Sequence, residues 1–334
     1  MNEGGWRGIF PVVPTPLKED ESLDLAGLSL LVNHYLEAGC HGLTVLGSGG
    51  EHPYFTREEK LEIVKAAVAA AAGRAPVLIG MGYPGLADAI GFGRAAEDLG
   101  ADGFLVALPS YYPLLIEGAV EYYTRLGAAL ARPLFYYHFP QITRLRFSAR
   151  ALARILSLPG IRGIKESSLN LREMRVHLRA AQGREWSLFS GNSYLLLEAL
   201  DLGGAGAICP IPSVAPRLVV DCYRAFQAND REKARRLQQR ILELLPLMNS
   251  FGLPPAAQKL GLRAMSRLPF SLPLGNKPRQ AVIKEAIRQL GHPIGARVRT
   301  PLPQLAAGEG RQIAALLQRV ELASEARSPA PPGG

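Results

Sequence analysis

The sequence has few cysteines and no long apolar run. Both features exclude whole classes of protein. Its 334 residues contain three cysteines, Cys40, Cys209 and Cys222, an odd number without C-x-x-C or Cys/His metal spacing. This pattern argues against a disulfide framework and against a zinc site, and it indicates free thiols. The longest purely apolar runs, such as residues 66–72, are much shorter than the roughly 20 residues that cross a bilayer.

The N-terminus lacks the basic segment followed by an apolar one that is typical of secretory signals. A cytoplasmic location is therefore expected. The composition is 48% hydrophobic and 20% charged, which is ordinary for a globular chain that folds alone.

The net charge of +9 could attract nucleic acid, anionic lipid or an anionic substrate. The charges are scattered, however, and the densest run, 231–236, mixes both signs at helical spacing, which favours a solvated helix face. No nucleic-acid motif accompanies this run. Nucleic-acid binding is therefore kept only as a minor alternative, which would require steeply salt-dependent association.

Short apolar runs bounded by glycine or proline alternate with longer amphipathic stretches along most of the chain. The runs that predict strands are Gly8–Val13, Gly42–Leu46, Val77–Met81, Gly103–Leu108, Leu134–His138, Gly163–Glu166, Ser187–Ser190 and Ala205–Cys209. Most lack hydrophobic/polar alternation, which is typical of strands buried on both faces of a parallel sheet. Strands that are each followed by a helix predict an α/β protein with a closed (β/α)8 TIM barrel; an open doubly wound sheet is the alternative.

Helices are predicted from apolar residues at three-to-four spacing, and residues 56–59 form a capping box before one of them. The predicted helices are 24–38, 58–72, 86–99, 116–131, 148–156, 171–181, 194–202, 217–228, 230–247, 254–262 and 277–290. The expected division is a catalytic barrel over 6–228, a C-terminal helical region over 229–302 and a C-terminal extension over 303–334. The end of this extension is rich in proline and glycine and is expected to be disordered.

Active sites of such barrels lie at the C-terminal ends of the strands, where this chain places several reactive side chains. Lys165 falls in a short strand beside Gly163 and Ile164. A lysine held inside a barrel must be neutralised or paired. As a neutral amine it can attack a ketone, and the resulting iminium stabilises the carbanion that aldol chemistry needs. The alternatives are a lysine that reaches solvent from a strand end, or one paired with Glu166.

Other candidates end neighbouring strands. Tyr137 beside such a lysine can shuttle protons, with a core aromatic as the alternative. The loop Gly47-Ser48-Gly49-Gly50 either offers N–H groups and a hydroxyl to a carboxylate or is a tight turn. Cys209 either touches substrate or is a small buried thiol, and His138 should face away from Tyr137 by strand alternation. The glycine-rich run 203–206 precedes a strand, which places it at the opposite, stability face of the barrel.

These segments resemble the dihydrodipicolinate synthase / N-acetylneuraminate lyase family of Schiff-base class I aldolases, over about residues 7–302. The resemblance rests on Thr15-Pro16, on Gly47-Ser48-Gly49-Gly50-Glu51 against the family's G-[ST]-T-G-E, on Tyr137-His138-Phe139-Pro140 against Y-[NH]-x-P, and on Gly163-Ile164-Lys165-Glu166-Ser167 against G-[IL]-K-[EDQ]-[ST]. It implies a barrel with a C-terminal helical appendage. It also implies a lyase that condenses or cleaves pyruvate, or a related 2-oxo acid, with an aldehyde.

Carried over to the matching positions, the resemblance implies that Lys165 forms the Schiff base and that Tyr137 shuttles protons. Ser48 would link Tyr137 to Tyr111, which in this family often reaches in from a neighbouring subunit of a homotetramer, a dimer of dimers. Further substrate-binding candidates are Gly47, Gly49, Gly50 and Cys209. The chemistry needs no metal or organic cofactor, only the covalent Schiff base.

Two departures from the family pattern bear on the substrate. Gly49 replaces the second threonine of the loop, so one hydroxyl to the 2-oxo acid carboxylate is missing. Ile142 replaces the arginine with which dihydrodipicolinate synthases hold aspartate semialdehyde, which argues against lysine biosynthesis, although Arg144 lies nearby. Dihydrodipicolinate synthase proper, a sialic-acid lyase, a dehydratase or aldolase of a 2-oxo-3-deoxy sugar acid, and a catalytically silent barrel that binds a 2-oxo acid stay open.

Overall fold

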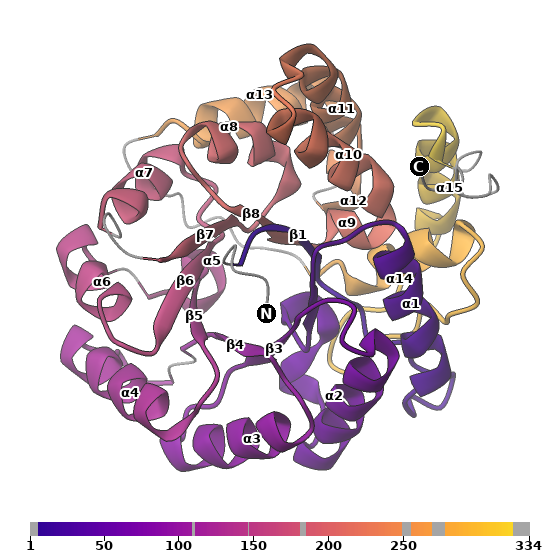
Figure 1. Ribbon diagram of the computed structural model, residues 1–334. Coiled ribbons are helices and arrows are strands. Elements are labelled where there is room, and N and C mark those ends of the chain that lie inside the picture. The colour runs from indigo at the N-terminus through magenta and orange to yellow at the C-terminus, as the bar shows by residue number, and fades with distance from the viewer. Residues whose placement is uncertain are drawn as a thin grey trace.

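The computed structural model describes residues 6–108, 111–145, 147–180, 185–248, 255–268 and 278–322. Parallel strands form one sheet in the order β1-β8-β7-β6-β5-β4-β3-β2 (Figure 1). The strands are β1 (Gly8–Pro11), β2 (Leu43–Val45), β3 (Val77–Met81), β4 (Gly103–Val106), β5 (Leu134–His138), β6 (Ile161–Glu166), β7 (Ser187–Ser190) and β8 (Gly206–Cys209). A parallel bridge between Val12 and Thr44 joins β1 to β2 and completes the ring. The predicted barrel is confirmed, and the alternative of an open sheet is wrong.

Helices cover the outside of the ring (Figure 1). They are α1 (Leu25–Glu37), α2 (Arg57–Ala71), α3 (Leu86–Asp98), α4 (Ile116–Ala129), α6 (Ala149–Leu156), α7 (Leu171–Ala180), α8 (Leu196–Asp201) and α10 (Pro216–Gln227). Thr56 and Glu59 form the predicted capping box at the start of α2. Short helices that were not predicted follow some strands: η1 (Ser48–Gly50), η2 (His52–Tyr54), α5 (Pro140–Thr143) and α9 (Ile211–Val214). The helix predicted over 194–202 begins as the short helix η3 (Ser193–Leu195) and continues as α8.

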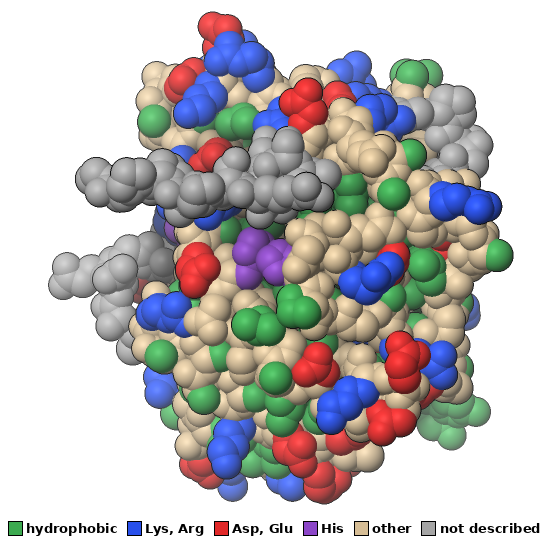
Figure 2. Space-filling model, turned by 90° about the vertical axis from the view of Figure 1, so that its right-hand side faces the viewer, with side chains coloured by type: hydrophobic (Ala, Val, Ile, Leu, Met, Phe, Trp, Pro, Cys, Tyr) green, Lys and Arg blue, Asp and Glu red, His purple; other side chains and the backbone are tan. Residues whose placement is uncertain are grey.

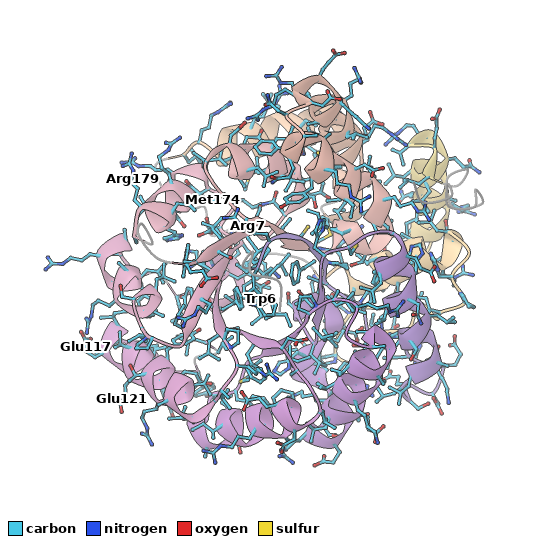
Figure 3. The ribbon with its side chains drawn as sticks, viewed as in Figure 1. Trp6, Arg7, Glu117, Glu121, Met174 and Arg179 are labelled. Carbon is cyan, nitrogen blue, oxygen red and sulfur yellow. The ribbon has the colours of Figure 1, made fainter. Side chains whose placement is uncertain are left out.

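The strands bury side chains on both faces. Those that point into the ring form a mainly aromatic and branched core that includes Phe10, Phe135 and Phe189. Trp6 closes this core from the N-terminal ends of the strands, with its ring centroid 5.0 Å from that of Phe135. Trp6 lies near the middle of the ring in Figure 3, whereas Glu117 is at the periphery. The C-terminal ends of the strands are therefore the end of the ring at which an active site can lie.

The C-terminal region is helical, as predicted. Its helices are α11 (Arg231–Glu243), α12 (Leu245–Met248), α13 (Pro255–Met265), α14 (Gln280–Gln289) and α15 (Glu309–Arg319). The single helix predicted over 230–247 is wrong in one respect, because it is interrupted at Leu244. Helix α15 was not predicted, and it buries Ile313, Leu316 and Leu317. The end of the extension, 323–334, lies outside the described residues, and the division at 228 and 302 stays a prediction.

Helix α14 packs against α9, which follows β8, so the C-terminal region reaches the C-terminal ends of the strands. None of the helices in the described segments is both long and apolar enough to span a membrane. On the face shown in Figure 2, basic and acidic side chains are interspersed. This distribution agrees with the scattered charge of the sequence.

Candidate active site

A cavity of about 420 Å³ lies at the C-terminal ends of the strands. Its wall includes Ser48 after β2, Tyr137 from β5, Lys165 from β6 and Cys209 from β8. The barrel therefore brings together, from segments far apart in sequence, four of the side chains that the sequence singled out. This is the end of the barrel where enzymes of this fold carry their active sites.

Lys165 and Tyr137 are paired across the two central strands of the site. They occupy partner positions in the β5–β6 register, so both side chains point into the ring. Lys165 is 2% exposed, and its Nζ lies 4.1 Å from the centroid of the Tyr137 ring. In the described part of the chain Lys165 forms no ion pair, and Glu166 pairs with His177 on the opposite side of β6. The two alternatives for Lys165, a solvated lysine and one paired with Glu166, are therefore wrong.

Ser48 extends this pair. Its Oγ lies 3.1 Å from the phenol oxygen of Tyr137, and either oxygen can donate the hydrogen bond. The carbonyl of Ser48 accepts a hydrogen bond of 3.0 Å from Nε2 of Gln280, the first residue of α14. The C-terminal region thus helps to fix the loop that carries Ser48, and Gln280 itself lines the cavity.

The glycine-rich loop forms the short helix η1, and its glycines differ in role. Gly49 lines the cavity, and Gly47 and Gly50 do not. The N–H of Gly50 donates to the carbonyl of Gly47 at 2.9 Å, and the carbonyl of Gly50 accepts from the Thr15 hydroxyl at 2.9 Å. A helix leaves its first N–H groups without intrahelical acceptors. The N–H groups of Ser48 and Gly49 are therefore the donors of this loop that can face a ligand.

The absence of a side chain at Gly49 has a local cause. A Cβ added there would lie 3.0 Å from Cγ1 of Val12, a residue of the barrel interior that also lines the cavity. Val12 thus occupies space next to the position where the family pattern has a threonine. The glycine at position 49 therefore fits the packing of Val12, which follows β1.

Tyr111 lies away from the cavity of its own chain. It is 91% exposed, and its ring packs edge-on against Tyr112 with centroids 5.1 Å apart. Within one molecule, the series of hydrogen-bonded hydroxyl groups therefore runs from Tyr137 to Ser48 and ends there. A link from Ser48 to Tyr111 of another subunit stays a prediction.

The residue at the position of the family's arginine, Ile142, lies at the cavity. Ile142, on α5, lines the cavity with 53% of its surface exposed, whereas Arg144 is not part of the cavity wall. A different arginine, Arg279, does line the cavity, and its Nη1 lies 2.8 Å from Oε1 of Glu309 on α15. Arg279 could not be predicted as a residue of the site, because no local pattern places it near the strand ends.

His138 faces away from the cavity, as strand alternation predicted. It contacts His177 of α7, with ring centroids 5.3 Å apart, and its Nε2 lies 3.3 Å from Oε2 of Glu173. The neighbouring carboxylates of Glu166 and Glu173 raise the pKa of His138, although burial alone would lower it. Burial raises the pKa of Glu166, but the adjacent His138 and His177 outweigh this effect and lower it.

Cys209 is a buried thiol at the edge of the site. Its Sγ lies 2.8 Å from Oγ of Ser193, and burial raises its pKa to about 11 although Ser193 and Lys165 act in the opposite direction. Burial likewise raises the pKa of Cys40 and of Cys222 to about 12. All three are free, as predicted.

These thiols are expected to resist alkylation in the folded protein. Because each pKa is raised, the thiolate that reacts is formed only as the pH approaches about 11, and at pH 8 it is on the order of 0.1% of Cys209 or less. Intact-mass measurement after iodoacetamide treatment at pH 8 should show no adduct on the native chain and three adducts after unfolding in urea. Rapid labelling of native Cys209 would contradict this expectation.

Comparison with known proteins agrees with this site. Residues 5–282 match the sequence profile of the dihydrodipicolinate synthetase family. The chain is 34% identical over 271 residues to an uncharacterized DapA-like lyase of Halobacterium salinarum, covering 81% of this chain and 88% of that protein. It is 34% identical over 275 residues to 4-hydroxy-tetrahydrodipicolinate synthase of Methanoculleus marisnigri, covering 80% of this chain and 93% of that protein.

The fold has a close counterpart among solved structures. YagE, a prophage protein of the dihydrodipicolinic acid synthase family from E. coli K12 solved in complex with pyruvate, gives a TM-score of 0.83 at 27% identity. The alignment covers 95% of this chain and 99% of that one. The fold and the site thus define a barrel lyase with a buried lysine. The chain belongs to the dihydrodipicolinate synthetase family, which confirms the family and the enzyme class predicted from sequence.

Proposed function

We propose that this protein is a Schiff-base lyase that joins pyruvate, or a related 2-oxo acid, to an aldehyde or cleaves the corresponding product. The observation that carries the proposal is the buried Lys165, which forms no ion pair in the described chain and lies against the Tyr137 ring. Pyruvate is the ligand of the structurally similar YagE. The aldehyde is a separate question.

The reaction follows from the positions of three side chains. The Lys165 amine attacks the carbonyl carbon of the 2-oxo acid, and loss of water gives an iminium. Loss of a proton from the adjacent methyl carbon gives an enamine, which forms the new carbon–carbon bond with the aldehyde. Hydrolysis then returns the free lysine. Each step moves a proton, and the Tyr137 phenol with its hydrogen-bonded Ser48 hydroxyl is placed to carry it. No metal or organic cofactor takes part.

The carboxylate of the 2-oxo acid is held by the N–H groups at the start of η1. Ser48 and Gly49 line the same cavity as Lys165, and a hydrogen bond from the Gly50 N–H to the Gly47 carbonyl closes the loop. Cys209 contributes a neutral thiol to the same wall. Because the family's threonine hydroxyl is missing at Gly49, the backbone carries most of this recognition.

The acceptor is an aldehyde other than aspartate semialdehyde. Ile142 offers an apolar side chain where a bidentate arginine would hold that substrate's carboxylate. Assays that follow pyruvate loss with a panel of aldehydes identify the acceptor. Activity confined to aspartate semialdehyde would contradict this part of the proposal and would favour the activity named for the Methanoculleus relative.

Reductive trapping tests the proposed chemistry. The protein is incubated with pyruvate and sodium borohydride, which reduces an imine to a stable amine, and its intact mass is measured. The expected gain is one pyruvate less one water plus two hydrogens, located on Lys165 by peptide mapping. A catalytically silent barrel, the rival hypothesis, would instead bind the 2-oxo acid saturably without an adduct, and a Lys165→Ala variant would bind it equally well.

Removing the Tyr137 phenol should slow the reaction without preventing covalent binding. A Tyr137→Phe variant keeps the ring that packs against Lys165 but loses the proton carrier, so kcat should fall by about 10²- to 10⁴-fold. The borohydride adduct should still form, although more slowly. Steady-state kinetics together with timed trapping measure both effects, and an unchanged kcat would exclude Tyr137 from proton transfer.

The assembly and the location belong to the same proposal. A homotetramer, built as a dimer of dimers, would bring the exposed Tyr111 of one subunit to Ser48 of another. Three free thiols agree with a reducing, cytoplasmic compartment. Sedimentation analysis of the purified protein tests the subunit number.

A further inference from the structure

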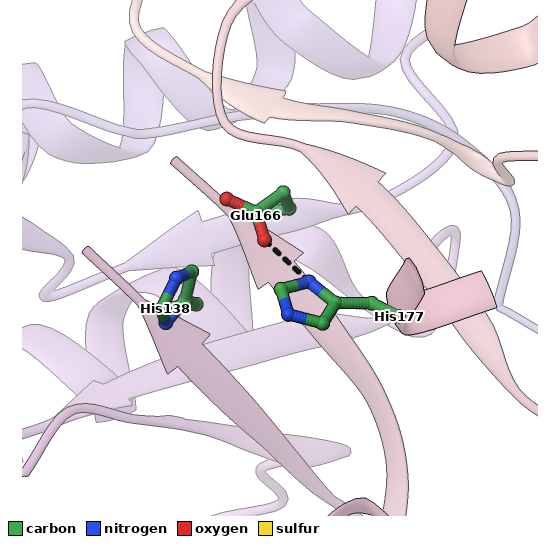
Figure 4. A group of neighbouring side chains, drawn as sticks. All are labelled: His138, Glu166 and His177. Carbon is green, nitrogen blue, oxygen red and sulfur yellow. Dashed lines mark ion pairs between the residues drawn. The ribbon is translucent and has the colours of Figure 1, made fainter. Parts of the chain in front are cut away.

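A group of buried side chains lies behind the proposed reactive pair, on the side of β5 and β6 that faces the helices. His138 ends β5, Glu166 ends β6, and His177 projects from α7 (Figure 4). These three residues are called the histidine–glutamate cluster below. One ligand-type atom from each lies within 4.8 Å of the other two. Three separate elements thus bring two imidazoles and a carboxylate to one point.

The side chains of the described residues that can balance the charge of Glu166 are histidines. Glu166 has no exposed surface, and a buried carboxylate needs a compensating positive charge. No lysine or arginine of the described segments pairs with Glu166; its partner is His177, whose Nδ1 lies 2.6 Å from Oε2. The other carboxylate oxygen, Oε1, accepts the N–H of Ser168 at 2.7 Å. The positive charge must therefore come from an imidazolium or from a bound cation.

The geometry also suits a cation. Nδ1 of His177 lies 2.6 Å from Oε2 of Glu166, the distance of a charged pair that shares a proton, and neither atom has another hydrogen-bond partner among the described residues. A metal ion would take the place of that proton. Zn²⁺ binds nitrogen and oxygen ligands at about 2.0–2.2 Å, which places tetrahedral ligand atoms roughly 3.4 Å apart. The 2.6 Å contact between His177 and Glu166 is shorter than this spacing, so these two side chains must move apart by about 0.8 Å to hold an ion between them.

Glu173 supplies an outer carboxylate. Its Oε2 lies 3.3 Å from Nε2 of His138, and its side chain is 31% exposed. Histidines that bind metal commonly have a carboxylate next to the imidazole, which orients the ring. Because Glu173 reaches the surface whereas the cluster is buried, it also marks the side from which an ion can enter.

We propose that His138, Glu166 and His177 bind one divalent transition-metal ion, with Zn²⁺ the best match to two imidazoles and a carboxylate. The ion lies on the opposite side of the strands from Lys165 and Tyr137 and takes no part in the Schiff-base chemistry. It joins the ends of β5 and β6 to α7. Those are the strand ends that carry the reactive pair, so the ion stabilises the frame of the site.

Metal titration of the full chain tests this proposal. Protein freed of metal with a chelator is titrated with Zn²⁺ in a calorimeter, and one ion per chain is expected to bind. At about a hundredfold excess of zinc over Kd, the melting temperature should rise by about 4 °C. Co²⁺ in place of Zn²⁺ should give the visible absorption of a four-coordinate site.

Matched variants locate the ion. His177→Gln and Glu166→Gln should abolish the binding of one equivalent, whereas His34→Gln should keep it. His34 is a suitable control because its ring lies 4.1 Å from that of His292, a second place where two imidazoles meet. Circular dichroism checks that each variant is folded, and His138→Gln replaces any variant that is not.

Three results would overturn the metal site: no binding by the unaltered protein, full binding by the cluster variants, or only the weak spectrum of hydrated, six-coordinate Co²⁺. Borohydride trapping of pyruvate needs no metal. A failure of the metal site is therefore distinguishable from a failure of the proposed lyase activity.

Discussion

Replacing Lys165 by alanine is expected to abolish the pyruvate adduct and to lower kcat by at least about 10⁴-fold. Without the amine no iminium forms, and no other group of the site can stabilise the carbanion in its place. Among the described residues, no other lysine lines the cavity. Mass spectrometry after borohydride treatment measures the adduct, and a pyruvate-coupled assay measures kcat.

Two further variants separate chemistry from packing. Lys165→Met keeps most of the buried side-chain volume, so it should lose activity as fully as the alanine variant if the amine is what matters. Lys60→Met should keep both the adduct and the activity, because Lys60 lies over the Tyr83 ring outside the cavity wall. An adduct that survives in both Lys165 variants would place the imine on another lysine and would remove the basis of the proposed mechanism.

The fold could be predicted from sequence because its signal is local. A strand buried on both faces must be a short run of apolar residues, and each such run ends at a turn that the sequence marks with glycine or proline. All eight predicted strands are present; β3, β5 and β7 have the predicted bounds, and the ends of the others differ by at most two residues. The dependence on local signal also explains why helix α15 was not predicted. Its buried residues, such as Ile313 and Leu317, lie close to a low-complexity end that dominates the local composition.

The site could be predicted in part. Lys165, Tyr137 and Ser48 end strands, and the rule that barrel sites lie at those ends is enough to group them. The positions of Gln280 and Arg279 could not be predicted. These residues are more than 200 positions away from Ser48 in the sequence, and only the packing of α14 brings them next to the loop that carries Ser48. The histidine–glutamate cluster was missed too, since its members come from three elements and have no sequence spacing to read.

The same long-range packing predicts a large effect far from Lys165. Lys284 on α14 and Glu51 directly after η1 form an ion pair of 2.5 Å, and neither side chain has any exposed surface. Nζ of Lys284 also donates to the carbonyl of Arg297 at 2.7 Å. Burial lowers the pKa of Lys284, and the adjacent Glu51 opposes that effect. Each charge thus depends on the other for a favourable environment.

Replacing Lys284 by methionine should therefore lower the free energy of unfolding by about 3–5 kcal/mol, because it leaves the Glu51 carboxylate buried without a counter-charge. It should also raise KM for pyruvate, since Glu51 adjoins the loop whose N–H groups are proposed to hold the carboxylate. Urea denaturation and steady-state kinetics measure the two effects. Lys233→Met, on an exposed face of α11, is the matched control and should change stability by no more than about 0.5 kcal/mol.

A double variant shows whether the pair or the lysine alone is responsible. Adding Glu51→Gln to Lys284→Met removes the unpaired charge but keeps an acceptor for the N–H of Arg299, which donates to Oε2 of Glu51 at 2.8 Å. The double variant should recover a large share of the lost stability, because a neutral amide is far less costly to bury than a lone carboxylate. Equal losses in the single and double variants would mean that Lys284 acts through packing and its bond to Arg297. In that case the barrel loop would owe its position to Gln280 and Thr15 instead of to the buried charge pair.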